Sequence, residues 1–293
     1  MYNIQMDIFS VVSLFILGTI IGSFLNVIIY RYNTGRGIGG RSHCFSCRNT
    51  LTPIDLIPVF SYLFLGGKCR HCKSKVSIQY PAVELLTGCL FAVVAFVNLG
   101  HLSTSLSLFA FEVVYQLIVM SFLVLIIVYD MKHKIIPDAF AYGFAFIAVL
   151  HLFIGFEPNV GLVWLTPTGF DMIAGVLLAF PFYFLWRVSG GRWMGLGDAK
   201  LALGIGWFLG LSAGATAIIF SFWIGAVISI MLLLSIKLIK GLRKEVPALL
   251  RAKLPRLTIK SEVPFAPFLI LGLLTVFFFG YNMFSNISFF SFL

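Results

Sequence analysis

The sequence predicts an all-α polytopic membrane protein with about eight transmembrane helices and a cytoplasmic loop that contains four cysteines. Three observations lead to this fold class. Of the 293 residues, 60% are hydrophobic and only 11% are charged, whereas a typical soluble domain has about 25% charged residues. Long apolar runs recur along the whole chain, and four of the five cysteines lie together in one polar segment.

The first apolar run, at about 8–29, is expected to be a transmembrane helix that is not removed. A secretory signal peptide begins with basic residues, but the first 30 residues include Asp7 and no Lys or Arg. An apolar stretch of about 20 residues is long enough to cross the hydrocarbon core of a bilayer. Further runs of this kind occupy 82–99, 107–129, 139–156, 172–187, 214–237 and 265–287.

A shorter, glycine-rich apolar run from Ala199 to about Ala213 is expected to be one more crossing. The basic residues favour this count, because loops rich in Lys and Arg stay in the cytoplasm. With eight crossings all 21 Lys and Arg residues fall on one side, whereas seven crossings would divide them. Eight of them lie in 31–80 and eight more in 237–260. We therefore expect both termini outside and the loop 32–80 in the cytoplasm.

The net charge of +10 follows from this topology. Basic loops at the cytoplasmic face contact anionic lipid, so the lipid bilayer is an expected partner. Nucleic acid is not an expected partner, because the basic loops lack interleaved aromatic side chains on which bases could stack.

The four cysteines of the first loop form two C-x2-C pairs separated by 21 residues: Cys44 and Cys47, then Cys69 and Cys72. Two such pairs can present four thiolates tetrahedrally to Zn²⁺. Two disulfides are the alternative, but disulfides are rare in the reducing cytosol, where the topology places this loop. Because four cysteines fill the coordination sphere, the expected zinc is structural. Cys89 lies within an apolar span and is expected to be a small core residue.

Two aspartates lie where apolar spans meet the cytoplasmic face: Asp130 at the end of the third span and Asp198 at the start of the sixth. A carboxylate within hydrocarbon is costly and therefore indicates a functional site. Two carboxylates held together share a proton and can act as general base and general acid in peptide hydrolysis. On these residues alone, a structural explanation is equally favoured. In it, Asp130 and Asp138 are interface residues beside basic side chains, and Asp198 caps the N-terminus of the sixth helix.

Several motifs occur together in a fixed order. They are "GSFLNVIIYR" (22–31), the four-cysteine segment that ends in "YPAVELLTG" (44–88), "YDMKHKIIPD" (129–138), "GLGDAKLALGIGWFLG" (195–210) and "VPFAPFL" (263–269). With these motifs the sequence resembles the bacterial type IV prepilin leader peptidases, membrane aspartic proteases of the GxGD class, along nearly the whole chain.

This resemblance implies a bifunctional enzyme of the bacterial inner membrane. The enzyme would remove the basic leader of type IV prepilins or pseudopilins after a glycine, at the cytoplasmic face. It would then N-methylate the new N-terminal residue, with S-adenosylmethionine as methyl donor. Asp130 and Asp198 match the catalytic aspartates of the family, and the four cysteines match its zinc ligands.

By the same resemblance, Asn26, Arg31 and Glu84 are the candidate residues for holding the methyl donor. The sequence has no glycine-rich nucleotide-binding loop of the Rossmann type. On the residues alone, the first motif is better explained by close helix packing through Gly18 and Gly22, a small-xxx-small spacing.

We expect residues 1–99 to form the methyltransferase region, with the zinc loop at 32–80, and residues 100–293 to form a six-helix peptidase core. The alternative function is an ion- or proton-coupled transporter that uses Asp130 and Asp198. Transport sites usually lie near the membrane midplane, whereas both aspartates lie toward one face. A non-enzymatic scaffold that presents the zinc loop to partners would leave Asp198 unexplained.

Overall fold

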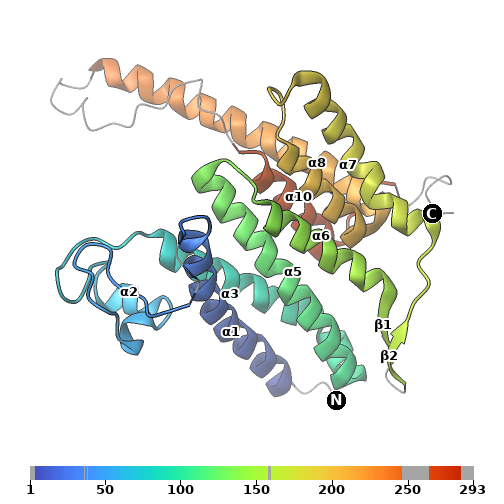
Figure 1. Ribbon diagram of the computed structural model, residues 1–293, viewed down its shortest axis with the longest axis horizontal. Helices are drawn as coiled ribbons and strands as arrows, with labels where there is room; N and C mark the ends of the chain where they lie inside the picture. Colours follow the sequence, from blue (N-terminus) through green and yellow to red (C-terminus); the bar gives the residue numbers. More distant parts are fainter. Residues whose placement is uncertain (1–3, 36, 38, 158–159, 246–263, 285–293) are drawn as a thin grey trace. The chain divides into compact units, whose positions relative to one another are not determined.

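The computed structural model describes residues 4–35, 37, 39–157, 160–245 and 264–284. The described chain is mainly helical (Figure 1). It divides into two compact units, Met1–Pro167 and Thr168–Leu293, each with its own helical core. The predicted functional division at residues 99 and 100 stays a prediction.

The first unit is built from apolar helices, and the cysteine loop joins two of them. Its elements are α1 (Ile4–Arg31), the 3-10 helix η1 (Pro53–Leu56), α2 (Phe60–Phe64), α3 (Gln79–Val97), α4 (Leu99–Thr104), α5 (Leu106–His133), α6 (Asp138–Phe153), β1 (Ile154–Glu157) and β2 (Gly161–Trp164).

Local residues set the ends of α5 and α6. The hydroxyl of Ser105 accepts a hydrogen bond from the first turn of α5 and caps it. At the other end, Lys134 adopts a left-handed conformation and donates its main-chain N–H to the carbonyl of Asp130 at 2.7 Å. Pro137 then precedes α6 with extended backbone angles. The turn between the two helices is therefore short and well defined.

A small antiparallel sheet corrects the predicted all-α fold. β1 pairs with β2 in a register that places Ile154 opposite Trp164 and Glu157 opposite Gly161. The segment is rich in β-branched and aromatic residues, which favour extended backbone, and Gly161 has a φ of 92° that allows the chain to turn. The sequence prediction placed most of β1 at the end of the span 139–156 and β2 in the connection that follows it.

Glycines bring α1 and α3 into close contact. A methyl group at Gly18 would lie 2.8 Å from Cα of Gly88, and one at Gly22 would lie 2.8 Å from Cα of Glu84. The two helices are thus antiparallel, with Gly18 facing Gly88 and Gly22 facing Glu84. The predicted packing through Gly18 and Gly22 is confirmed.

The described part of the second unit contains three helical segments: α7 (Gly169–Ser189), α8 (Leu196–Glu245) and α10 (Ala266–Phe279). A capping box starts α7, in which the side chains of Thr168 and Asp171 each bond to the other's main-chain N–H. A methyl group at Gly206 of α8 would lie 2.6 Å from Cα of Gly175 of α7. Small residues therefore set the approach of α7 and α8, as they do for α1 and α3.

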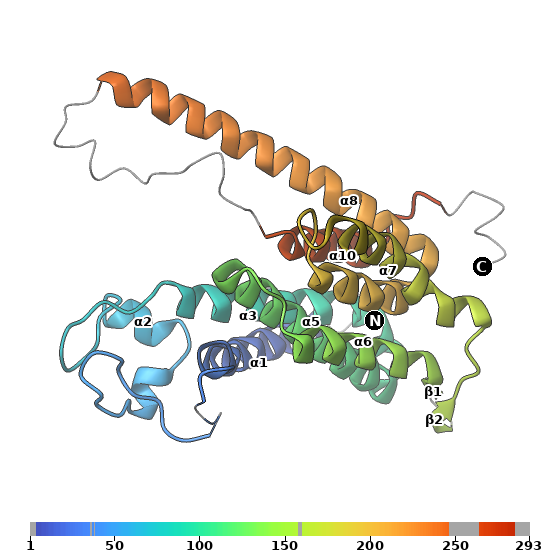
Figure 2. The ribbon, with the colours of Figure 1, turned by 45° about the horizontal axis from the view of Figure 1, so that its top comes forward.

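α8 consists of two arms that run in opposite directions (Figure 2). Gly210, between them, has non-helical angles of φ 78° and ψ 176°. A methyl group at Gly214 would lie only 3.5 Å from Cα of Gly206, although eight residues of straight helix span about 12 Å. The chain therefore folds back at Gly210, and the glycine-rich run after Asp198 forms an arm of its own.

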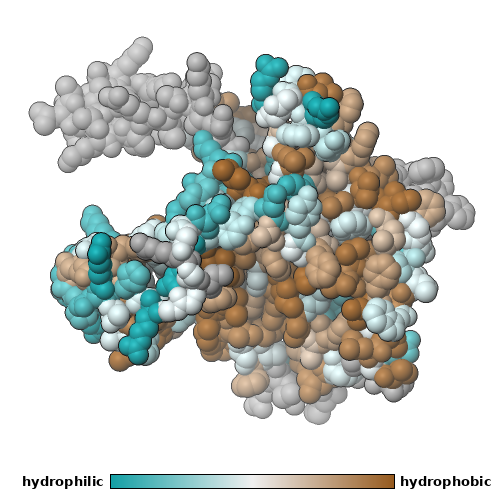
Figure 3. Space-filling model, viewed as in Figure 1, coloured by the Kyte–Doolittle hydropathy of each residue, from teal (hydrophilic) through white to brown (hydrophobic). Residues whose placement is uncertain are grey.

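Five helices of the described residues are long and apolar enough to cross a membrane: α1, α3, α5, α7 and Leu196–Ser235 of α8. The last of these contains the turn at Gly210. α6 and α10 are shorter apolar helices. On the visible face of the first unit, hydrophobic side chains cover α1, and hydrophilic ones gather over the cysteine loop (Figure 3). The predicted count of eight crossings and its orientation stay predictions.

Replacing Gly22 by alanine tests the contact between α1 and α3. The added methyl group meets main-chain atoms of α3, so the helices must separate, at a cost of about 1–3 kcal/mol. We expect Gly22→Ala to lower the temperature at which the detergent-solubilised protein loses its monodisperse elution peak. Gly37→Ala is the matched control, because nothing lies within 4 Å of the new methyl group. Equal thermal stability of the two variants would contradict the contact.

Candidate functional site

The four cysteines sit on two turns of the same design. In the first turn, the main-chain carbonyl of Cys44 accepts a hydrogen bond from the main-chain N–H of Arg48 at 2.9 Å, and Arg48 has a φ of 59°. In the second turn, the main-chain carbonyl of Cys69 accepts a hydrogen bond from the main-chain N–H of Lys73 at 3.1 Å, and Lys73 has a φ of 58°. Each turn is closed by an isolated bridge between its flanking residues. The two C-x2-C motifs therefore form equivalent turns with the same local hydrogen bonds.

The structure brings all four thiols together. Their sulfur atoms lie within 4.8 Å of one another, and Sγ of Cys44 lies 3.8 Å from Sγ of Cys72. In a tetrahedral site with Zn–S bonds of about 2.3 Å, neighbouring sulfurs are about 3.8 Å apart. The predicted clustering is confirmed, and its spacing fits a four-coordinate metal ion.

Hydrogen bonds lower the pKa of two of these thiols, those of Cys44 and Cys72. The main-chain N–H of Cys47 donates to the sulfur of Cys44 and lowers the pKa of Cys44 to about 6. The hydroxyl of Ser74 lowers the pKa of Cys72 in the same way. At Cys47, the main-chain N–H of Asn49 favours the thiolate, but partial desolvation and the neighbouring thiols outweigh it and raise the pKa to about 11. Neighbouring thiolates repel one another, and a divalent cation among them would stabilise all four.

An ion pair ties the second cysteine turn to η1. Nε of Arg70 donates to the buried carboxylate of Asp55 at 2.7 Å. The hydroxyl and main-chain N–H of Thr52 donate to the same carboxylate at 2.7 and 3.1 Å. Burial alone would raise the pKa of Asp55, but the bonds from Thr52 and Arg70 hold it below its usual value. The carboxylate thus joins η1 to the metal-binding turns.

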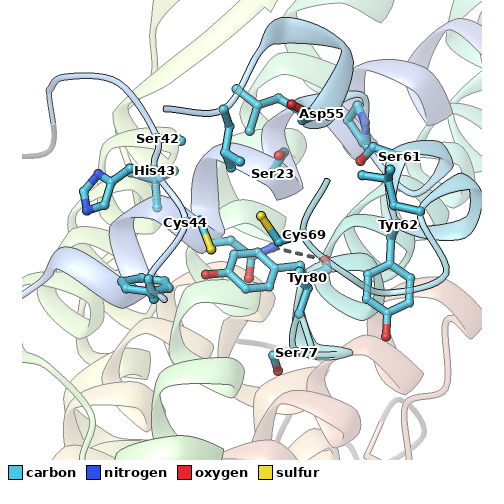
Figure 4. Close-up of a pocket in the computed structure, with 18 of the residues that line it drawn as sticks. Ser23, Ser42, His43, Cys44, Asp55, Ser61, Tyr62, Cys69, Ser77 and Tyr80 are labelled. Atoms are coloured by element: carbon cyan, nitrogen blue, oxygen red, sulfur yellow. Dashed lines mark hydrogen bonds between the residues drawn. The ribbon is translucent and has the colours of Figure 1, made fainter. Parts of the chain in front are cut away.

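A cavity of about 1130 Å³ lies between the cysteine loop and the helices α1 and α3 (Figure 4). This volume slightly exceeds the range of about 300–1,000 Å³ that is usual for small-molecule sites. Apolar side chains make up much of the wall, including Ile20, Phe24, Leu56 and Ile57. The three candidate donor-binding residues also line it: Asn26, Arg31 and Glu84. The structure therefore brings them to one cavity.

Asn26 lies at the end of the glycine contact between α1 and α3. Its side chain is fully buried, at 0% exposed. Nδ2 donates to the carbonyl of Gly22 at 3.3 Å and to the carbonyl of Tyr80 at 3.2 Å, which joins the two helices. Oδ1 accepts no hydrogen bond from any described residue.

Glu84 lies on α3 and is 6% exposed. Its Oε2 accepts the main-chain N–H of Val59 at 2.8 Å. Val59 has a φ of 61° and a ψ of −52°, an unfavourable backbone conformation for a β-branched residue. The carboxylate therefore holds a strained peptide at the start of α2, directly after Pro58, which lines the cavity.

Arg31 and the tyrosines have roles that the sequence did not indicate. The guanidinium of Arg31 donates to the carbonyls of Gly37, Gly39 and Arg41 at 3.3, 2.6 and 3.4 Å, so it organises the glycine-rich start of the loop. Tyr30 stacks on Tyr80, with ring centroids 5.0 Å apart. The signal for Tyr30 is its position four residues after Asn26, on the helix face that also carries Gly18 and Gly22.

The two candidate catalytic aspartates are both buried, and they lie in different units. Asp130 is in the last turn of α5 and is 5% exposed, whereas Asp138, the first residue of α6, is exposed. The two residues therefore differ in burial, and their location at the membrane interface stays a prediction. Asp198 is the third residue of α8 and is 8% exposed. It lies within the first helical turn, so the prediction that it is the N-cap is wrong. The pairing of Asp130 with Asp198 stays a prediction.

Two family models match separate parts of the chain. One part contains the cysteines and the cavity residues, and the other contains the two candidate catalytic aspartates. The model of the bacterial Peptidase A24 N-terminal domain matches residues 16–98, which include the cysteine cluster and the cavity. The model of the type IV leader peptidase family matches residues 117–230, which include both aspartates. The chain belongs to the type IV leader peptidase family. It is a protease, and several relatives in the family are named prepilin leader peptidase/N-methyltransferase.

Relatives resemble the chain over most of its length. The prepilin leader peptidase/N-methyltransferase of Bacillus subtilis (strain 168) is 31% identical over 93% of this chain and 95% of the relative. Proteins with the same name from Neisseria gonorrhoeae and Myxococcus xanthus are 30% and 32% identical, over 74% and 76% of this chain and 80% and 63% of their own lengths. No solved structure matches the chain. Together with the apolar helices, these likenesses identify a multi-pass membrane enzyme.

Serine substitution tests the metal site. Cys44→Ser removes one of the four sulfurs, and we expect the metal content measured by mass spectrometry to fall from about one ion per chain to near zero. The loop should also become sensitive to limited proteolysis within residues 32–80, because the two cysteine turns lose their link. Cys89→Ser is the matched control, since Cys89 lies on α3 outside the cluster. Unchanged metal content in Cys44→Ser would disprove the site.

Proposed function

We propose that this protein removes the leader peptide of type IV prepilins or pseudopilins and then methylates the new N-terminus. Similarity across 93% of the chain to a prepilin leader peptidase/N-methyltransferase carries the proposal, because it covers both halves of such an enzyme. The buried carboxylates of Asp130 and Asp198 and the cavity beside the cysteine loop are chemically suited to the two activities.

For cleavage, Asp130 and Asp198 form the catalytic pair. Two adjacent carboxylates cannot both ionise easily, so they hold one proton between them. The ionised carboxylate removes a proton from water as it attacks the scissile carbonyl, and the protonated one donates to the carbonyl oxygen. The cut follows a glycine and takes place at the cytoplasmic boundary of the inner membrane.

For methylation, S-adenosylmethionine binds in the cavity lined by Asn26 and Glu84. When bound, it supplies an electrophilic methyl group on a positively charged sulfur. The fit rests on the cavity volume, on the buried Oδ1 of Asn26 and on the buried carboxylate of Glu84. Arg31 contributes indirectly, by holding the glycine-rich segment at the rim.

The cysteine cluster holds a structural Zn²⁺ through Cys44, Cys47, Cys69 and Cys72. All four ligand positions are thiolates, so no position is open for a catalytic water. The metal would join the two sulfur-presenting turns and so shape the wall of the cavity, because Cys44 and Cys69 are also lining residues.

The membrane arrangement that fits this chemistry has eight crossings, with the two arms of α8 as separate spans. The arms run antiparallel, as two spans joined at Gly210 require. This arrangement places both termini outside and the loop 32–80 in the cytoplasm. Asp130 and Asp198 then face the same side of the membrane.

Paired substitutions test the catalytic aspartates. The protein is expressed with a pilin-like substrate that has a basic leader ending in glycine, followed by phenylalanine. We expect Asp130→Asn and Asp198→Asn each to slow leader removal at least about a hundredfold, because each removes one member of the acid–base pair. Leader removal is measured by mass spectrometry of the substrate.

Asp171→Asn is the matched control, since Asp171 belongs to the capping box of α7 and should leave cleavage close to wild type. Normal folding is checked by metal content and by the elution profile. Normal cleavage by either Asp130→Asn or Asp198→Asn would refute the pair. Loss in both variants with normal folding would exclude the transporter and scaffold functions.

A further inference from the structure

One buried acceptor in the cavity lacks a donor. Oδ1 of Asn26 is fully buried and accepts no hydrogen bond from the residues that the structure describes. Buried polar atoms of proteins are nearly always paired, so an oxygen in this position indicates a partner outside the described chain. Asn26 lines the cavity, and the cavity is the route by which such a partner reaches it.

The neighbours of Asn26 determine the orientation of its amide. Nδ2 faces two carbonyl oxygens, those of Gly22 and Tyr80, at 3.3 and 3.2 Å. A carbonyl oxygen accepts hydrogen bonds and cannot donate one. A reversed amide would place Oδ1 against both oxygens and lose both bonds. Oδ1 is therefore the atom that is left for a ligand, and the ligand must supply a donor.

Glu84 places a carboxylate near this acceptor. Gly22 packs against Cα of Glu84, and Asn26 follows Gly22 by one helical turn, which is about 6 Å along the axis. Both side chains line the same cavity. The N–H of Val59 and the hydroxyl of Ser23 both bond to the carboxylate, and a carboxylate has about four acceptor positions, so positions remain for a ligand. A neutral amide oxygen and a carboxylate at this spacing favour a cation that carries several N–H bonds.

The arginines of the cavity wall are already engaged elsewhere. Arg31 donates to main-chain carbonyls of the glycine-rich segment. Arg70 forms the ion pair with Asp55. The described structure therefore directs neither guanidinium to Asn26, and a ligand is the better source of the donor.

We infer that Oδ1 of Asn26 and the carboxylate of Glu84 form an amine-binding subsite of the cavity. This inference rests on the proposed methyltransferase function. Two molecules in that reaction carry a primary amine: the methyl donor, in its α-amino group, and the cleaved pilin, at its new N-terminus. Both amines present the same N–H groups and, when protonated, the same charge. The subsite is therefore assigned to an amine, and the experiment determines whether the methyl donor or the pilin supplies it.

Binding measurements on the full-length, zinc-loaded protein in detergent test the subsite. The variants are Asn26→Leu and Glu84→Gln. The latter retains an oxygen for the N–H of Val59 and loses only the charge, which guards against misfolding. Asn98→Leu is the matched control, because Asn98, the C-cap of α3, is another buried amide and bonds to Val94 and Gln116, outside the cavity.

Two pairs of probes separate the sources of the amine. The first pair is S-adenosylmethionine and its analogue without the α-amino group. The second pair is a pilin-like peptide that begins with phenylalanine and the same peptide with an acetylated N-terminus. Dissociation constants are measured by calorimetry for each protein and each probe.

We expect Asn26→Leu and Glu84→Gln to weaken binding of the amine-bearing member of one pair about tenfold or more. Binding of the amine-free member of that pair should not change. Weakened S-adenosylmethionine binding assigns the subsite to the donor, and weakened binding of the free peptide assigns it to the pilin. Asn98→Leu should change neither affinity.

Unchanged affinity for both amine-bearing probes would overturn the subsite and would mean that water satisfies Oδ1. Equal losses for the amine-bearing and amine-free members of a pair would also overturn it, because the variants would then have changed the cavity as a whole. Failure of the wild-type protein to bind S-adenosylmethionine would instead count against the proposed methyltransferase function, and leader cleavage would remain a separate readout.

Discussion

The close contact between α1 and α3 is the constraint on which the first unit depends. Gly18 and Gly22 allow the two backbones to touch, and in hydrocarbon such packing replaces the hydrophobic effect as the force that joins helices. The contact also fixes a register, in which Asn26 reaches the carbonyl of Tyr80. A larger side chain at either glycine would separate the helices and move every group above them. The cavity is therefore positioned in part by the glycine contact, because the two helices joined there form part of its wall.

The cysteine loop solves a different physical problem. Between α1 and α3 the chain has too few residues to bury a core of its own, and small domains of this kind usually need a metal or disulfides. The four clustered sulfurs bring the two cysteine turns together, as a hydrophobic core would in a larger domain. The ion pair between Arg70 and Asp55 extends the same framework to η1. Metal binding at this cluster would thus be coupled to the shape of the cavity, because Cys44 and Cys69 also line it.

The sequence predicted the features that depend on pattern and missed those that depend on tertiary contact. Apolar length located the helices, and C-x2-C spacing located the sulfur cluster, because both signals are local. The strained backbone of Val59 and the hydrogen bonds of Arg31 could not be predicted from local sequence, since each depends on a partner outside its own helix. The sheet of β1 and β2 was missed because β1 continues the apolar run of the preceding helix, and β2 is too short to show a strand pattern.

The turn at Gly210 explains why a carboxylate can be buried at Asp198. It limits the first arm of α8 to about 14 residues, or roughly 21 Å of helix, which is shorter than the roughly 30 Å of hydrocarbon. At least one end of such an arm must lie inside the hydrocarbon boundary. Asp198 is in the first turn at one of these ends, where unpaired N–H groups of the helix favour a negative charge. In the proposed arrangement of eight crossings, the short arm would bring the aspartate into the membrane, and the unpaired N–H groups at the helix end would stabilise its charge there.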